Sequence, residues 1–261
     1  MTAPDQPSVH VDIEARETGV IARVTVDNAA ELNIVGSALM VEFIATVTAL
    51  GAREDLRAVV LTGAGERAFI GGADIREMAG LDGGRAREFI TRLHRMCAAL
   101  RGLPVPVIAR VNGYALGAGL EVAAACDLRV AASNAVFGMP EVRVGIPSVI
   151  EAALLPGLIG WGRTRELLLL GETIDAETAL RWGLVERVAP PDGLDAAVEA
   201  CLAALLQAGA RATRLQKQLI RRWEDLPVGE AIAAGIECFA DAYATDEPSR
   251  LMRAFIDRPR R

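Results

Sequence analysis

The sequence predicts a mixed α/β body followed by a helical C-terminal region. Strand-like and helix-like patterns alternate through about the first 190 of its 261 residues, and helical patterns dominate the rest. Hydrophobic residues make up 52% of the chain and aromatic residues only 4%, so the core is expected to be large and mostly aliphatic.

The body is expected to open with a β-hairpin, because residues 9–15 and 20–27 alternate apolar and polar side chains around Thr18-Gly19. Ser37 is predicted to cap the next helix, and four glycines within residues 63–74 predict a loop. In chain order, the other expected elements are a helix at 37–50, a strand at 58–62, a helix at 85–100, a strand at 106–111, a helix from about Gly117, strands at 128–131 and 135–137, helices at 163–170 and 176–182, and a strand at 185–188.

The C-terminal region is expected to contain only helices. Residues 194–207 have helical spacing, and the pattern continues from Arg211 almost to the end, with breaks near Pro227 and Pro248 that give three further helices. We therefore divide the chain into a body of residues 1–190, which carries the candidate site, and a helical region of residues 191–261. No internal sequence repeat stands out.

Charge and composition argue against several kinds of partner. A formal net charge of −6 does not fit a nucleic-acid-binding surface, and the basic residues 258–261 are interpreted as a short solvated tail. No signal peptide or membrane span is expected, because no apolar run reaches about 18 residues. The four cysteines are scattered without metal-ligand spacing, which favours buried thiols and a cytoplasmic location.

Two short segments, residues 112–121 and 137–141, carry the candidate chemistry, and each ends in a glutamate. The N–H of Ala118 falls in the first turn of a helix, where amides have no intrahelical partner and can bind a developing oxyanion. Gly117 and Gly119 let a ligand approach the backbone closely. Glu121 lies three residues after Ala118, on the same helix face. Together with Glu141, these groups could move protons beside an activated carbonyl.

Simpler interpretations remain open on spacing alone. A glycine-rich turn can serve only to pack a helix tightly against a strand, and Glu141 can be a solvated loop residue. Residues 68–75 follow a predicted strand and offer a second set of amides, but they also fit a glycine-rich surface turn. His10 and His94 suggest no catalytic role, and no Ser/His/Asp arrangement, P-loop or dinucleotide fingerprint is found.

Taken together, five segments resemble motifs of the crotonase (enoyl-CoA hydratase/isomerase) superfamily. They are residues 67–75, 106–119, 137–141, 179–185 and 244–248, in this order along the chain. The resemblance covers nearly the whole sequence. It implies a spiral of ββα units with a helical C-terminal trimerisation region, assembled as a homotrimer or a dimer of trimers.

The resemblance also implies an acyl-CoA thioester substrate and assigns residues to it. The backbone N–H groups of Ala73 and Ala118 would form the oxyanion hole, and Glu121 and Glu141 would flank a water molecule. No metal or redox cofactor is implied, and neither a nucleic acid nor a membrane is an expected partner. Further substrate-binding positions would be Ala68, Phe69, Gly72, Asp74, Ile75, Gly117, Gly119, Ile150 and Glu151.

The chain departs from the family pattern at two places near the expected site. Glu31 stands where a basic residue is common, which removes an expected contact to CoA phosphates. Ile150 and Glu151 occupy the positions of the usual glycine pair, so the wall of the acyl pocket is expected to be bulkier and to gain a carboxylate. Alternatively, Glu151 is a first-turn residue of a helix capped by Ser148.

Three activities fit these features. Two glutamates predict 2-enoyl-CoA hydration. The second alternative is a Δ3,Δ2-enoyl-CoA isomerase, which would need only one carboxylate to shuttle a proton between carbons, or another crotonase activity such as thioester hydrolysis. A binding or assembly protein with little catalysis is the third alternative, motivated by Glu31 and by Ile150-Glu151.

Overall fold

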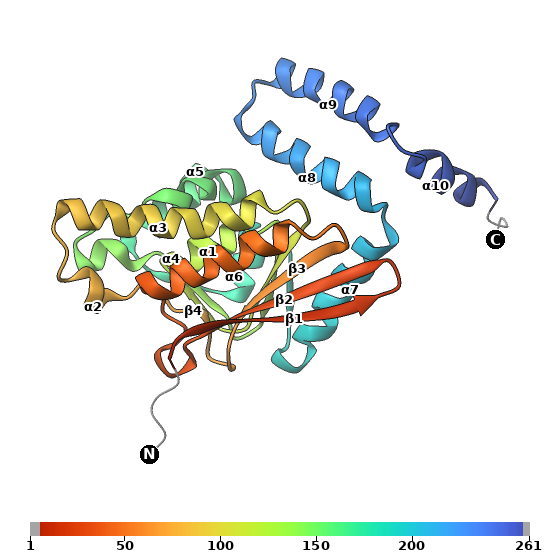
Figure 1. The fold of residues 1–261 in the computed structure, drawn as a ribbon. Coiled ribbons are helices and arrows are strands. Elements are labelled where there is room, and N and C mark those ends of the chain that lie inside the picture. Colours follow the sequence, from red (N-terminus) through yellow and green to blue (C-terminus); the bar gives the residue numbers. More distant parts are fainter. Residues whose placement is uncertain (1–5, 258–261) are drawn as a thin grey trace.

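Two β-sheets form the body of the computed structural model, which describes residues 6–257 (Figure 1). The basic residues 258–261 lie outside the described part of the chain. The larger sheet has the order β1 (Ser8–Arg16), β2 (Gly19–Asp27), β3 (Leu56–Gly63), β5 (Val107–Val111), β7 (Leu128–Ala132) and β10 (Arg187–Ala189). The smaller sheet has the order β4 (Ala68–Ile70), β6 (Tyr114–Leu116), β8 (Val136–Gly138) and β9 (Thr173–Asp175).

A ββα repeat links the two sheets. Strands β3, β5 and β7 are parallel neighbours in the larger sheet, and β4, β6 and β8 follow in the same order in the smaller one. Each unit thus adds one strand to each sheet before a helix returns the chain: α3 (Gly83–Gly102) after the first unit and α4 (Ala118–Ala124) after the second. The mixed α/β fold and the spiral of ββα units are confirmed.

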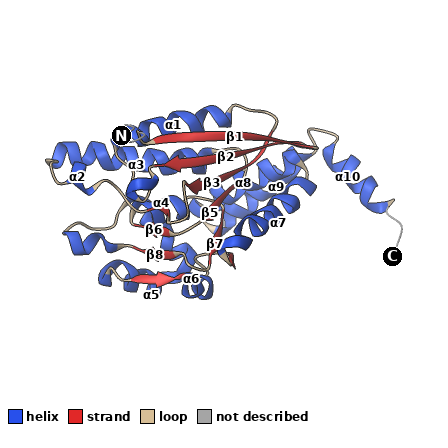
Figure 2. Ribbon diagram, turned by 90° about the horizontal axis from the view of Figure 1, so that it is seen from below, coloured by secondary structure: helices blue, strands red, loops and turns tan. Residues whose placement is uncertain are grey.

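Helices cover both faces of the larger sheet, and alternate residues of its strands face opposite sides. Val59 and Leu61 of β3 pack in the core shared with α1 (Ser37–Gly51) and α3, whereas Ala58 and Val60 pack against α7 (Leu194–Gln207). This two-sided burial explains why β3 is an almost continuous apolar run. Figure 2 shows the strands running between these layers.

Most sequence-predicted elements are confirmed, with small corrections. The hairpin pairs β1 with β2, and α6 (Ala176–Trp182) and α7 have the expected bounds. Ser37 is not the N-cap of α1; Gly36 occupies that position, and the Ser37 hydroxyl bonds instead to Glu77. The loop predicted for residues 63–74 contains strand β4 and leads into α2 (Ile75–Met78). The helix expected at 163–170 starts earlier, as α5 (Leu155–Leu170).

After α7, the C-terminal region continues with α8 (Ala210–Asp225), α9 (Val228–Ala242) and α10 (Glu247–Ile256), so the three further predicted helices are confirmed. Helix α9 packs on α8, and α10 extends away from the body (Figure 1). Among residues 6–257 no single helix is long and apolar enough to cross a membrane, although the bent pair 191–207 and 210–225 meets the length and composition limits together.

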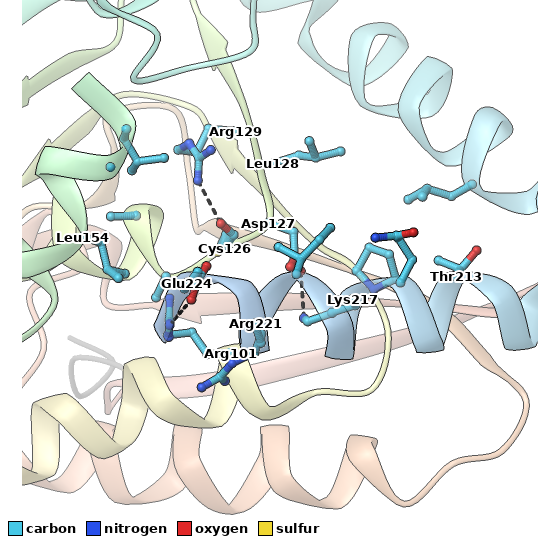
Figure 3. Close-up of a pocket in the computed structure, with 18 of the residues that line it drawn as sticks. Arg101, Cys126, Asp127, Leu128, Arg129, Leu154, Thr213, Lys217, Arg221 and Glu224 are labelled. Atoms are coloured by element: carbon cyan, nitrogen blue, oxygen red, sulfur yellow. Dashed lines mark hydrogen bonds and ion pairs between the residues drawn. The ribbon is translucent and has the colours of Figure 1, made fainter. Parts of the chain in front are cut away.

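Helix α8 is anchored to the body by a buried lysine beside a hollow of about 950 Å³ (Figure 3). Lys217 Nζ contacts Asp127 Oδ2 at 2.7 Å and donates to the carbonyl oxygens of Val105 at 2.9 Å and Leu100 at 3.4 Å. Burial lowers the pKa of Lys217, and the carboxylate of Asp127 opposes that shift. The ammonium group therefore has three acceptors, which is the condition under which a buried charge is tolerated.

We expect Lys217→Met to lower the free energy of unfolding by about 3 kcal/mol, because it leaves the Asp127 carboxylate without its cationic partner, with only the Val107 N–H as donor, and removes the donor to the Val105 carbonyl. Urea unfolding at pH 7 measures this loss. The double variant Lys217→Met with Asp127→Asn serves as the control and should regain part of the stability, since it removes the unpaired charge. An unchanged unfolding free energy for the single variant would contradict the anchoring role.

Candidate active site

A mostly apolar cavity of about 280 Å³ lies where the smaller sheet meets α3 and α4. Its wall combines the segment after β4, the start of α4, one side of α3 and the segment from Pro140 to Val149. The four residues expected to form the oxyanion hole and the acid–base pair all line this one cavity: Ala73, Ala118, Glu121 and Glu141. Residues from three separate stretches of the chain are thereby brought together.

The start of α4 is shaped by two glycines. Gly117 has φ +51°, a left-handed value that side chains rarely adopt, and it makes the turn from β6 into the helix. A Cβ on Gly119 would lie 1.9 Å from the carbonyl oxygen of Ile70, so only glycine lets α4 pack this closely on β4. Ala118, between them, is the first residue of the helix, and its N–H has no intrahelical acceptor.

The second amide comes from a parallel bridge between Val35 and Ala73. The bonds of this bridge are made by the residues around Ala73: Val35 N–H donates to Gly72 at 2.9 Å, and Asp74 N–H donates to Val35 at 3.0 Å. The bridge therefore does not use the N–H of Ala73, which is the usual alternation in a parallel pair. The N–H groups of Ala73 and Ala118 are thus not used in strand or helix hydrogen bonds, and both residues line the same cavity.

Glu121 is the buried acid of the site. Glu121 is only 4% exposed, and its Oε1 accepts a hydrogen bond from the N–H of Ala152 at 3.1 Å. Burial raises the pKa of Glu121 to about 8; the Ala152 hydrogen bond opposes this, and the charges of Glu141 and Glu151 add to it. Glu121 therefore carries a proton at neutral pH.

Glu141 reaches the same cavity from a 3-10 helix (Pro140–Val144) after β8. Its Oε2 accepts the hydroxyl of Ser148 at 2.8 Å. A Cβ on Gly117 would lie 2.4 Å from Oε1 of Glu141, so this carboxylate sits directly against the turn that begins α4. Glu141 is consequently not a freely solvated loop residue.

The other sequence-predicted site residues divide into two groups. Gly72, Ile75 and Gly117 line the cavity. The remaining positions are not among its lining residues: Ala68 and Phe69 are buried in β4, Gly119 packs on Ile70, Asp74 caps α2 through the N–H groups of Arg76 and Glu77, and Ile150 and Glu151 lie in the 3-10 helix Ile150–Leu154.

The expected cap at Ser148 is wrong, because Val149 is the N-cap of that 3-10 helix and the Ser148 hydroxyl bonds to Glu141. Glu31, where a basic residue is common, pairs with Arg76 at 2.8 Å.

Sequence reasoning missed the apolar wall of the cavity. Phe89, Ile90 and Leu93 of α3 line it, with spacing that fits one side of a helix, and so does Met78. Val144, Ile146, Pro147 and Val149 complete the apolar lining. The spacing in α3 is visible in the sequence, but it is equally typical of ordinary core packing. The wall indicates a ligand with an apolar chain.

Comparisons with known proteins identify the family. The family model described as enoyl-CoA hydratase/isomerase matches residues 16–260. A short-chain-enoyl-CoA hydratase from Clostridium acetobutylicum is 36% identical over 92% of this chain and 92% of its own length. A crotonyl-CoA hydratase from Syntrophomonas wolfei is 35% identical over 87% of this chain and 88% of its own length. The chain belongs to the enoyl-CoA hydratase/isomerase family of the crotonase superfamily.

Solved structures agree with this assignment. The crystal structure of an enoyl-CoA hydratase from Bacillus anthracis matches with a TM-score of 0.89 and 31% identity, covering 95% of this chain and 96% of that one. The enoyl-CoA hydratase structure from Mycobacterium smegmatis has a TM-score of 0.90 at 29% identity and covers 96% of this chain and 98% of that one. The crotonase fold is therefore shown over nearly the whole chain.

Proposed function

We propose that this protein is an enoyl-CoA hydratase that adds water across the 2,3 double bond of a short 2-enoyl-CoA thioester. One observation supports this most: a single apolar cavity is lined by two carboxyl groups and by two backbone amides that are not used in regular secondary structure. The related hydratases support the same substrate class. The coenzyme A thioester is the substrate, and the proposed chemistry needs no metal or redox cofactor.

The proposed reaction uses the two glutamates in different roles. Glu141 takes a proton from water while the water oxygen forms its bond to C3. The C2–C3 π electrons move toward the thioester carbonyl, whose oxygen is stabilised by the N–H groups of Ala73 and Ala118; one such donor is typically worth about 3–4 kcal/mol. Glu121, protonated at neutral pH, then gives its proton to C2. Syn addition follows if both glutamates face the same side of the double bond.

The decay of the enoyl-thioester absorbance of crotonyl-CoA tests this function directly. We expect a 3-hydroxyacyl-CoA product that contains one oxygen atom from solvent, detected by mass spectrometry in ¹⁸O-labelled water. Migration of the double bond in a 3-enoyl-CoA without water incorporation would assign an isomerase instead. Release of free coenzyme A would assign a thioester hydrolase.

Activity is expected to fall at alkaline pH. The pKa of Glu121 is raised to about 8, so the protonated acid dominates below pH 8 and is lost as the pH rises through that value. The ratio kcat/KM, which reports the pKa values of the free enzyme, should then decrease by about tenfold per pH unit well above pH 8. A pH–rate profile of crotonyl-CoA hydration from pH 6 to about pH 10 measures this limb. A rate that stays constant to the upper end would contradict Glu121 as the acid.

We also propose a homotrimer or a dimer of trimers and a cytoplasmic location. Helices α9 and α10 expose large apolar side chains, among them Val228, Ile236, Phe239 and Phe255, and such surfaces in a monomer commonly mark interfaces. All four cysteines are free thiols, which fits a reducing compartment. The division into a body of residues 1–190 and a helical region of residues 191–261 stays a prediction.

A further inference from the structure

A third carboxyl group, Glu151, is buried behind the cavity. Its side chain is only 7% exposed, and it is not among the residues that line the cavity. Oε1 lies 2.9 Å from His94 Nδ1, whereas Oε2 is buried and has no hydrogen-bond partner within residues 6–257. An unpartnered buried carboxyl oxygen is costly, so its presence calls for a physical reason.

Glu151 is connected to Glu121 through the adjacent residue Ala152 and to solvent through His94. On one side, the next residue in the chain, Ala152, donates its N–H to Glu121 at 3.1 Å. On the other side, the side chain of His94 is 53% exposed. Cys97, one turn after His94 on α3, is fully buried; burial, followed by the charges of Glu151 and Glu121, raises the pKa of its thiol well above the usual value. The two carboxyl groups are therefore neighbours.

The proposed hydration creates a need for a proton at this place. Each turnover transfers the proton of Glu121 to C2 and leaves a carboxylate, while Glu141 gains a proton from water. Glu121 is 4% exposed, and a bound acyl chain would fill the cavity in front of it. A route at the back of Glu121 would restore its proton without release of the substrate.

We propose that His94 and Glu151 form the route by which Glu121 exchanges its proton with solvent while the cavity is occupied. This inference rests on the proposed function. A solvent proton binds His94 Nε2 as the Nδ1 proton passes to Oε1 of the Glu151 carboxylate. Rotation of the resulting carboxyl group turns the same proton toward Glu121, which takes it and leaves Glu151 as a carboxylate again. His94 returns to its first tautomer by exchange with water, and Glu141 releases its proton to solvent with the product, so protons balance.

The groups that face this route come from four elements. His94 and Cys97 belong to α3, Glu121 to α4, Glu141 to the 3-10 helix after β8, and Glu151 to the 3-10 helix Ile150–Leu154. Glu151 and His94 act on the reaction through Glu121 and are positioning residues. The buried thiol of Cys97 lies within hydrogen-bonding reach of Glu151, stays protonated and carries no charge that would neutralise either carboxylate.

Isotope exchange tests the route. In D₂O, reversible dehydration of 3-hydroxybutyryl-CoA places the C2 proton on Glu121, and the route then replaces it by deuterium before rehydration. We expect Glu151→Gln, which has nearly the same shape but cannot pass a proton, to lower deuterium incorporation per dehydration event by about tenfold, while hydration of crotonyl-CoA falls less than about threefold. His94→Ala should behave similarly, and free imidazole should restore its exchange.

Glu177→Gln, on the exposed surface of α6, is the matched control and should leave exchange and hydration unchanged. Deuterium incorporation by Glu151→Gln at the wild-type level would overturn the proposal. An equal loss of exchange and hydration together with a lower melting temperature would also overturn it, because it indicates a structural role. If the wild type fails to hydrate crotonyl-CoA, C2 exchange of butyryl-CoA with the same variants tests the route separately from the proposed function. Absence of both reactions in the wild type would overturn both.

Discussion

Replacing Glu121 by Gln is expected to lower kcat for crotonyl-CoA hydration by about a thousandfold, because the variant has no proton to give to C2. The amide side chain keeps the size of the acid and can still accept the Ala152 N–H, so the local structure should persist. KM should change little, since the amides of Ala73 and Ala118 and the apolar wall still bind the thioester. Stopped-flow or conventional loss of enoyl-thioester absorbance measures the effect.

Glu141→Gln provides the complementary variant. It removes the group that takes the proton of water, and a similar loss of kcat is expected. The two losses should not add in the double variant, because the glutamates act on one reaction step. The surface variant Glu177→Gln serves as the control for both. Unchanged hydration by either active-site variant would remove the two-glutamate mechanism, and retained double-bond migration in Glu141→Gln would favour an isomerase.

The order of strands and helices could be largely predicted, but the two-sheet arrangement could not be derived from periodicity. Strands β4, β6 and β8 have three residues each, which is too short to show an alternating pattern. Strand β4 lies in the segment that was expected as a loop, and no element was predicted for the residues of β6. The ββα repeat is therefore hidden in the sequence and became an expectation only through the family resemblance.

The candidate site was predictable where the chemistry depends on the backbone. Ala118 was singled out for its amide and Glu121 for its spacing from Ala118, whereas Ala73 was assigned through the family resemblance. The structure places all three around one cavity with Glu141. Their catalytic roles stay predictions. Ser148 shows the limit of local reasoning: as an isolated serine before a helical turn it indicates a cap, but its hydroxyl bonds to a carboxylate seven residues earlier.

Long-range contacts account for the rest. His94 and Glu151 are separated by 57 residues and belong to segments whose patterns predict no shared role. The sequence pattern suggests no function for His94, and it fits Glu151 either as part of the pocket wall or as a first-turn residue. Only the packing of α3 against the 3-10 helix Ile150–Leu154 joins them behind Glu121. Pairing of this kind depends on tertiary structure that no local propensity encodes.

Gly119→Ala is expected to lower kcat/KM by about a hundredfold or more, because the added methyl group cannot fit where α4 meets β4. Its Cβ would lie 1.9 Å from the Ile70 carbonyl oxygen and 2.8 Å from the carbonyl carbon, so the helix must move by more than an ångström. That movement displaces the Ala118 N–H and Glu121 relative to Ala73, and a misplacement of about 1 Å is enough for a loss of this size. Enzyme kinetics with crotonyl-CoA measure it.

The same variant should lose about 3 kcal/mol of unfolding free energy through overpacking. Gly157→Ala is the matched control: it lies inside α5, nothing stands within 4 Å of its added Cβ, and alanine favours the helix, so stability and activity should be retained. Gly119→Ala with normal kinetics would mean that α4 can move without disturbing the oxyanion hole. In that case the position of Ala118 would not determine the rate, and other groups would have to stabilise the charge on the thioester oxygen. The same kinetics with Gly72→Ala, next to Ala73, would test whether the second amide has this role.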